Sequence, residues 1–294
     1  MTVFVQLAGG LGNQLFQCAT GLAVARRTGC ALVLDTWSGF VRDRWFRRQY
    51  GLQAYAVAAR VATPLERVPV WLFRAESRVR PPVGLVTDRL YGRFLVEQAR
   101  TVQAGLDEAV RERAAWLLGY WQSPRYFDDL RPEIQRTLMP PPPANPTTRA
   151  LGTSMRAGAS LAIGIRLYEE SSDARLHAHD GRVKRMAEIA AAVDRVRHAQ
   201  AGVRCYVFCT HRAPALAELG LPDDTVYLTG DQGFGHPDDS LWLLAQCRHH
   251  VLTNSTFYWW GAYLSAAVHG DRQHIVAADN FLNRDALLPT WETF

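Results

Sequence analysis

Lysine is almost missing from this chain of 294 residues. Lys184 is the only lysine among the 33 basic residues, so 32 are arginines, a balance typical of codon usage in a GC-rich bacterial genome. The abundance of arginine therefore says little about function by itself. Charge is also nearly balanced, because 28 acidic residues leave a formal net charge of +5. That excess is too low for a protein that binds nucleic acid by neutralising many phosphates, although it allows a basic pocket for one small anion.

Long apolar runs and a secretory signal are missing as well. No stretch approaches the roughly 20 apolar residues of a membrane span, so no transmembrane segment is expected. The first residues carry no basic side chain and soon reach glycine, so no signal peptide is expected. The five cysteines are an odd number in apolar surroundings, which predicts reduced thiols and a cytoplasmic location. Cys205 and Cys209 lie in an expected strand without a second pair, so no metal site is expected.

The chain has enough apolar sequence for one large or two ordinary domains, since 48% of its residues are hydrophobic. Its opening predicts a strand at 3–7, a helix at 13–28 that Asn13 could cap, and a second strand at 31–35. The connections between these elements are short. The opening therefore predicts a βαβ unit and a parallel sheet.

Four prolines at 140–143, followed by Pro146, exclude helix and predict a connection between domains. We therefore expect one domain at 1–145 and a second at 146–294. The second half again alternates strands with helices, which makes the expected fold class α/β with two Rossmann-like domains. Its expected strands are at 160–166, 204–209, 226–228, 249–253 and 274–278, and the expected helices beyond the first are at 127–138, 182–200, 239–247 and 256–269.

Candidate ligand-binding residues follow the first strand of each domain, because ligands of open parallel sheets collect at the carboxyl ends of the strands. The loop 8–14 contains Gly9, Gly10 and Gly12, which either let the backbone approach a ligand or only form a tight turn. Arg166 ends the strand at 160–166, where its forked donors either meet a phosphate or lie in solvent.

A second group of polar residues begins the helix at 256–269, which is apolar on almost every side. Asn254, Ser255 and Thr256 would present hydroxyl and backbone N–H groups to phosphate oxygens, or serve only as helix caps. Trp259 and Trp260 are interpreted as packing residues. The polar loop after Arg166 offers several general bases, unless it is simply solvated: Glu169, Glu170, Asp173, His177 and His179.

Four segments, in this order, resemble the bacterial α-1,2-fucosyltransferase family (glycosyltransferase family 11). They are the glycine motif Gly9–Gln17, the segment Gly119–Phe127, the pair Asp239–Cys247 and Asn254–Ala262, and the tail Ile275–Trp291. The resemblance implies a GT-B fold with two domains facing a cleft. It also implies a GDP-sugar in the second domain, an acceptor in the first, and inversion at the anomeric carbon without a metal or separate cofactor.

The resemblance also assigns residues. Around the donor diphosphate it places Gly10, Gly12, Asn13, Arg166, Asn254, Ser255, Thr256 and Phe257, and near the nucleotide Thr210, His211 and Asp239. The family pattern His-x-Arg-Arg-x-Asp falls on 164–169, so Arg166 is kept while Gly164 and Leu167 depart from it. Glu169 is then the first choice for the catalytic base, with Asp173 second, beside Arg166 as the catalytic cation.

The sequence therefore predicts a divergent GDP-sugar transferase that acts on a saccharide or small molecule. This hypothesis includes a natural product or a thiol as the acceptor, and a homodimer as the assembly. One alternative is a homologue that binds nucleotide or glycan without turnover. A weaker alternative is a dinucleotide-dependent oxidoreductase, because Gly10, Gly12 and Asp35 imitate a Rossmann start, although Leu15 stands where a third glycine is needed.

Overall fold

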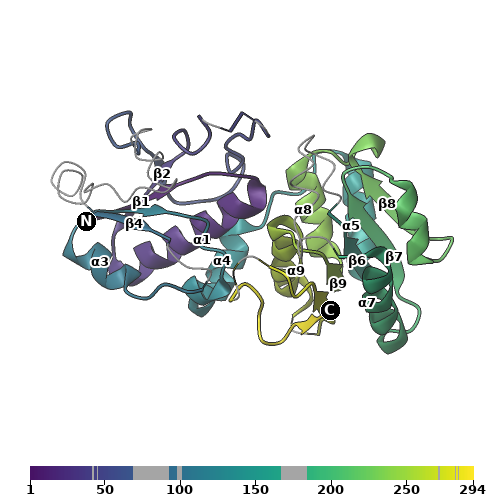
Figure 1. The fold of residues 1–294 in the computed structure, drawn as a ribbon. Helices are drawn as coiled ribbons and strands as arrows, with labels where there is room; N and C mark the ends of the chain where they lie inside the picture. The colour runs from purple at the N-terminus through teal and green to yellow at the C-terminus, as the bar shows by residue number, and fades with distance from the viewer. Residues whose placement is uncertain are drawn as a thin grey trace. The chain divides into compact units, whose positions relative to one another are not determined.

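The computed structural model describes residues 1–41, 43–44, 46–68, 93–97, 101–166, 184–270, 272–281, 283 and 285–294. The chain divides into two compact units, each with one parallel sheet (Figure 1). Unit 1 comprises Met1–Leu138 and Asn283–Ala286, and unit 2 comprises Met139–Leu282 and Leu287–Phe294. The expected α/β fold class is confirmed.

The sheet of unit 1 has the strand order β3-β2-β1-β5-β4, and every pair is parallel. Its strands are β1 (Thr2–Gln6), β2 (Ala31–Asp35), β3 (Arg60–Val61), β4 (Arg93–Val96) and β5 (Ala115–Leu118). The central strand β1 is buried on both faces, with Val3 and Val5 fully inaccessible. Its unbroken apolar run is what a central parallel strand requires.

The helices of unit 1 are α1 (Leu11–Thr28), α3 (Leu106–Glu112) and α4 (Arg131–Leu138). Helix α1 ends at Gly29, whose φ of 70° is the left-handed conformation that favours glycine. Helix α1 begins two residues before the expected start, so Asn13 lies inside its first turn and does not cap it. The helix expected at 127–138 is instead a short 3₁₀ turn, η3 (Asp128–Leu130), followed by α4, and another 3₁₀ turn, η2 (Pro124–Tyr126), precedes it.

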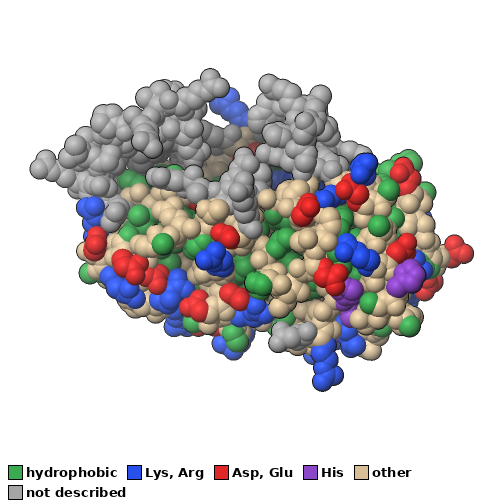
Figure 2. All heavy atoms as spheres, turned by 60° about the horizontal axis from the view of Figure 1, so that its bottom comes forward, with side chains coloured by type: hydrophobic (Ala, Val, Ile, Leu, Met, Phe, Trp, Pro, Cys, Tyr) green, Lys and Arg blue, Asp and Glu red, His purple; other side chains and the backbone are tan. Residues whose placement is uncertain are grey.

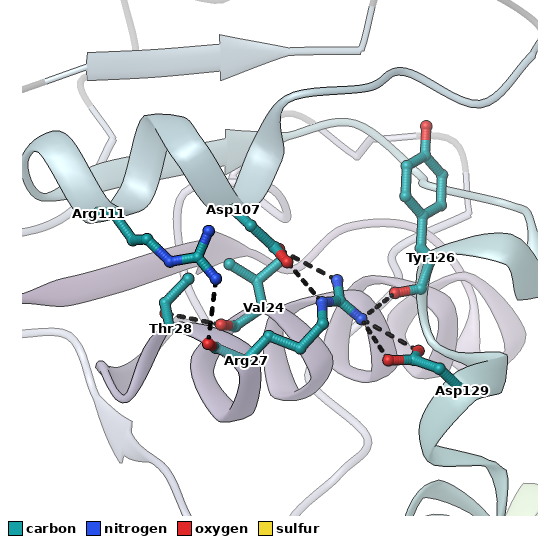
Figure 3. A network of polar contacts seen from close by, with 7 residues as sticks. All are labelled: Val24, Arg27, Thr28, Asp107, Arg111, Tyr126 and Asp129. Atoms are coloured by element: carbon teal, nitrogen blue, oxygen red, sulfur yellow. Dashed lines mark hydrogen bonds and ion pairs between the residues drawn. The ribbon is translucent and has the colours of Figure 1, made fainter.

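Arg27, in the last turn of α1, ties three elements of unit 1 together (Figure 3). Its Nε donates to Asp107 of α3 at 2.6 Å, and its Nη1 donates to Asp129 of η3 and to the carbonyl of Tyr126, each at 3.1 Å. Burial alone would lower the pKa of Arg27, but the hydrogen bonds and charges of Asp107 and Asp129 raise it above its ordinary value. The guanidinium therefore stays charged and fixes the end of α1.

The sheet of unit 2 has the strand order β11-β10-β9-β6-β7-β8, again all parallel. Its strands are β6 (Ser160–Gly164), β7 (Arg204–Cys209), β8 (Val226–Thr229), β9 (His249–Leu252), β10 (Ile275–Ala277) and β11 (Glu292–Thr293). Its helices and 3₁₀ turns are α5 (Pro146–Ala157), α7 (Met186–Ala199), η5 (Pro214–Leu219), η6 (Gly230–Gln232), α8 (Pro237–Gln246) and α9 (Thr256–His269).

Helix α9 is the core helix of unit 2, as its apolar sequence predicts. The ring of Trp259 stacks on Tyr263 with centroids 4.8 Å apart, and Trp260 packs edge-on against Trp259. Both tryptophans are fully buried, so their interpretation as packing residues is confirmed. Gly261 lets α9 approach α8, because a Cβ there would lie 2.6 Å from the Cβ of Leu244.

Among the coloured residues on the face drawn in Figure 2, basic and acidic side chains alternate, and they form no extended region of one charge. This mixture matches the small net charge of the chain. In the described ranges, no helix has both the length and the apolarity to cross a bilayer.

Candidate functional site

The carboxyl edge of the sheet in unit 2 brings several predicted residues together. Gly164 of β6 is paired in register with Phe208 of β7 and with Leu252 of β9. Two residues beyond Gly164, Phe208 and Leu252 lie Arg166, Thr210 and Asn254, respectively. The register of three adjacent strands therefore places these side chains along one edge.

Arg166 is held at this edge through its backbone. Its N–H donates to the hydroxyl of Thr253 at 2.9 Å, and that hydroxyl donates to the carbonyl of Gly164 at 3.1 Å. The N–H of Thr253 also donates to Gly164 at 3.0 Å. Strand β6 ends at Gly164, earlier than expected, so Arg166 lies in the connection that these bonds fix to the loop before α9.

Tyr258 of α9 adds another restraint on the same segment. Its hydroxyl donates to the carbonyl of Ile165 at 3.0 Å. Its ring lies so close to β6 that a Cβ at Gly164 would be 2.5 Å from the Cγ of Tyr258. A side chain at position 164 and the ring of Tyr258 therefore exclude each other, which explains the glycine at the first position of the altered motif. Neither Thr253 nor Tyr258 was predicted, although a glycine in a strand is a known signal of close approach.

The first turn of α9 supplies the positive end of a helix dipole at this edge. Ser255 is the N-cap residue, and its side chain makes no capping hydrogen bond. Thr256 and Phe257 are half-buried in the first turn. Asn254 has a structural contact, because its Nδ2 donates to the carbonyl of Asn280 at 2.8 Å. That contact anchors the start of α9 to the loop that follows β10.

The residues predicted to meet the nucleotide lie on the loop after β7 and in the first turn of α8. Thr210 is exposed, and its Oγ1 lies 3.3 Å from the Nδ1 of His211. The carbonyl of Thr210 accepts the N–H of Gly230, which ties this loop to the end of β8. Asp239 lies in the first turn of α8 and is half-buried. Glu169 and Asp173 lie outside the described residues.

The glycines of the loop 8–14 in unit 1 differ in whether the local structure requires a glycine. Gly9 has a φ of 74°, and a Cβ there would lie 2.6 Å from the Nδ2 of Asn13, so local structure requires a glycine. Gly10 has an ordinary φ of −71°, and the nearest atom to a Cβ there is the Cζ of Arg48 at 4.0 Å. Packing within unit 1 therefore does not require glycine at position 10, which favours the ligand-facing interpretation. Gly12 is buried in the first turn of α1.

Two buried glutamines of the same motif hold this loop, and neither was predicted from the sequence. Gln14 donates to the carbonyls of Gly9 and Gln49 and accepts the N–H of Gly51. Gln17 accepts the N–H of Ala8 and donates to the carbonyl of Gly119, each at 2.9 Å. These two glutamines therefore fix the conformation of the glycine loop.

Asp35 cannot serve a ribose as the oxidoreductase alternative requires. It is fully buried at the end of β2, and its carboxylate accepts the N–H groups of Trp37, Ser38 and Val68 and the hydroxyl of Ser38. These four bonds occupy both carboxylate oxygens. Asp35 therefore shapes the loop after β2 and has no remaining capacity for a cofactor hydroxyl.

In the described part of the chain, no group of three His, Cys, Asp or Glu residues is arranged to hold a metal ion. Cys205 and Cys209 are buried as free thiols in β7. Burial raises the pKa of the Cys205 thiol, which disfavours the thiolate that a metal would need.

The sequence profile of glycosyl transferase family 11 matches residues 111–293. An alpha-1,2-colitosyltransferase of Escherichia coli is 25% identical over 276 residues, which are 89% of this chain and 87% of that protein. Among solved structures, a mutant of Arabidopsis thaliana FUT1 in complex with GDP gives a TM-score of 0.50 at 13% identity, covering 93% of this chain and 69% of that one. Fucosyltransferase NodZ from Bradyrhizobium gives 0.49 at 17% identity, covering 88% and 91%. The fold is that of the GT-B glycosyltransferases.

Proposed function

Because this chain belongs to glycosyl transferase family 11, we propose that it transfers a sugar from a GDP-sugar to a saccharide or another small molecule. The sugar is fucose or a related unusual sugar, in keeping with the colitosyltransferase of Escherichia coli. A natural-product or thiol acceptor and a cytoplasmic location belong to the same proposal. The observation that carries it is the hydrogen bond from Arg166 to Thr253, which fixes the guanidinium-bearing segment beside the start of α9.

The chemistry follows from the charge that a departing GDP develops. When the bond between the anomeric carbon and the diphosphate oxygen breaks, the leaving oxygen gains negative charge. Arg166 and the N–H groups of the first turn of α9 stabilise this charge, so no metal is required. The acceptor oxygen attacks from the opposite face and inverts the anomeric centre. Its proton passes to a carboxylate, for which Glu169 is our first choice and Asp173 our second.

The first experiment separates binding from turnover. Calorimetric titration with GDP and with UDP tests the nucleotide, and incubation with several GDP-sugars and saccharides, with and without EDTA, tests transfer. We expect GDP to bind more tightly than UDP, GDP release to depend on an acceptor, and EDTA to have no effect. NMR of the product gives the anomeric configuration. Binding of GDP without turnover on any pair would favour the non-catalytic alternative.

The second experiment tests the role of Arg166. Arg166→Ala should lower turnover about 100- to 1,000-fold, as expected when one donor to a developing anion is lost. Arg166→Lys should retain part of the activity, because it keeps the charge but loses the forked geometry. Arg197→Ala is the control, since Arg197 lies on α7 and pairs with Asp194. Equal turnover in Arg166→Ala and the control would refute the assignment.

A further inference from the structure

The exposed aromatic side chains of the described chain gather in the loops of one unit. Trp37, Phe46 and Tyr120 are 45%, 39% and 44% exposed, and no other described aromatic residue reaches this level. Trp37 and Phe46 follow β2, and Tyr120 follows β5 by two residues. Trp37 and Tyr120 therefore each lie two residues beyond the carboxyl end of a strand in the sheet of unit 1, which is the edge that ligands use in such sheets.

A carboxylate lies beside Tyr120 at this edge. Glu97 directly follows β4, the strand that pairs with β5, and its N–H donates to Leu118 at 2.8 Å. Its Oε2 accepts the N–H of Tyr120 at 2.7 Å and the N–H of Trp121 at 3.0 Å. One oxygen of the carboxylate thus holds two consecutive backbone donors of the loop after β5.

The backbone is strained to allow this arrangement. Gly119 has a φ of 155°, and a Cβ there would lie 2.4 Å from the Cβ of Glu97. Trp121 has a φ of 54°, in the left-handed region that a bulky residue rarely adopts. Strain of this kind persists where the surrounding structure enforces it, and it gathers at binding and catalytic sites.

The electrostatic surroundings of Glu97 do not explain why a charged group is used here. Among the described residues, hydrogen bonds reach Glu97 only at Oε2, and no Lys, Arg or His pairs with it. Burial raises the pKa of Glu97 against the opposing effect of the two N–H groups. A glutamine at this position would accept a hydrogen bond from the same two N–H groups, without the free-energy cost of removing a charge from water. Oε1 of Glu97 therefore remains able to accept a hydrogen bond from a ligand.

Tyr120 offers the second half of a binding surface. Its Cε1 lies 3.2 Å from the Cβ position of Gly9, so the ring rests against the glycine loop where a side chain is absent. Tyr120 as a whole is nearly half exposed, and its own N–H donates to the carboxylate of Glu97. An aromatic ring and a carboxylate on adjacent segments match the two surfaces of a sugar, which has an apolar C–H face and a rim of hydroxyl groups.

We propose that Glu97 and Tyr120 form a saccharide subsite of unit 1, in which the ring of Tyr120 packs on the C–H face of a sugar and Oε1 of Glu97 accepts a hydrogen bond from one of its hydroxyl groups. The inference rests on the proposed function, because it assigns this sugar to the acceptor. It also names the acceptor class as a saccharide.

The test compares four variants of the full chain: Glu97→Gln, Tyr120→Ala, Tyr120→Phe and Glu133→Gln. Glu133→Gln is the control. Glu133 lies on α4 of unit 1, and its carboxylate pairs with Arg26 of α1. The probes are GDP for calorimetry, and the GDP-sugar with the highest wild-type turnover paired with methyl glycosides of galactose, glucose and N-acetylglucosamine. Each variant is measured for its dissociation constant for GDP, its acceptor KM and kcat, and its melting temperature.

Glu97→Gln should raise the acceptor KM about 10- to 100-fold, the scale of a lost hydrogen bond to a charged group. Tyr120→Ala should raise it about 10-fold, while Tyr120→Phe keeps the ring and stays within about twofold of the wild type. All four variants should bind GDP as the wild type does.

Each other outcome has a definite meaning. If the wild type does not bind GDP, the proposed function fails, and this inference fails with it. If the wild type binds GDP and transfers sugar, but Glu97→Gln and Tyr120→Ala keep the acceptor KM of the wild type, the subsite alone is refuted. A lower melting temperature and kcat at unchanged KM would show that Glu97 only holds the loop. Wild-type donor cleavage that no methyl glycoside accelerates would overturn the saccharide assignment.

Discussion

Gly164 is a residue of unit 2 at which packing leaves little room for a side chain. Gly164→Ala places a Cβ 2.5 Å from the ring of Tyr258, so β6 and α9 must separate. We expect a loss of about 1–3 kcal/mol in the free energy of unfolding, measured by urea titration. Gly235→Ala is the matched control, because its Cβ would meet its nearest neighbour at 3.7 Å. In the double variant with Tyr258→Ala, the cost of Gly164→Ala should largely disappear, and full additivity would contradict this explanation.

Thr253 acts on Arg166 through a hydroxyl group that is buried. Thr253→Val removes the acceptor of the Arg166 N–H, so we expect a loss of about 1–3 kcal/mol in stability and weaker binding of GDP. Thr253→Ser keeps the hydroxyl and should bind GDP as the wild type does. Calorimetry with GDP measures this effect apart from stability. If valine and serine bind GDP equally well, Thr253 does not position Arg166.

Residue types with a distinct chemistry were predicted from the sequence, and residues that act through tertiary contacts were not. Arg166 and Thr256 were predicted as site residues because a cation after a strand and hydroxyl groups before an apolar helix stand out locally. Thr253 and Tyr258 were missed, because their roles depend on strand β6 lying beside β9. Asp35 stands where a Rossmann motif has its acidic residue. Only the structure shows that four hydrogen bonds already occupy its carboxylate.

The end of helix α1 is held by ion pairs of unequal burial. Arg27 is 27% exposed and bonds to α3 and η3, while its neighbour Arg26 is 64% exposed and, among the described residues, pairs only with Glu133. Arg27→Met should therefore cost about 2 kcal/mol of stability, because it leaves Asp107 without its partner. Arg26→Met should cost at most about 1 kcal/mol, as exposed ion pairs do. If urea titrations give the same loss in the free energy of unfolding for both variants, the network of Arg27 adds no stability beyond that of an exposed ion pair.

Helices with a strong pattern were predicted, and helices with weak propensity were not. The bounds of α9 were predicted as Thr256–His269 and are confirmed, because its apolar run has clear ends. Helix α5 was missed, since its threonines and Gly152 are poor helix formers. Tertiary packing explains Gly152, where a Cβ would lie 2.1 Å from the ring of Trp242. The cap at Asn145 and Pro146 at the first position are the signals that could have revealed α5.

At the scale of the molecule, the chain passes between its units more often than the sequence indicates. Asn283–Ala286 belongs to unit 1, although its neighbours on both sides belong to unit 2. Asp285 explains this, because it accepts the N–H of Val102 at 2.8 Å and pairs with Arg125 at 3.2 Å. A proline-rich connection can be recognised in a sequence, but a short segment that packs on a distant unit has no local pattern.

The stability of the molecule should fall in mild acid because of buried histidines in unit 2. Burial, with nearby positive charges, lowers the pKa of His249 to about 4 and that of His250 to about 3, and burial also lowers the pKa of His269. The unfolded chain binds protons on these groups near pH 6.5, while the folded chain does not. Stability is therefore unaffected above that pH and is lost as the pH falls from about 6.5 towards 4.

Urea titrations at pH 7.5 and pH 5.5 measure this loss directly. We expect about 1 kcal/mol from each of His249 and His250 over this interval, because both titrate in the unfolded chain only. Lowered carboxylate pKa values, such as that of Glu66, act below this window, where the unfolded carboxylates protonate. His250→Gln should reduce the pH-dependent loss by about 1 kcal/mol, whatever its effect at pH 7.5, while His198→Gln, at an exposed position, should leave it unchanged. If His250→Gln keeps the full loss, the buried histidine is not its source.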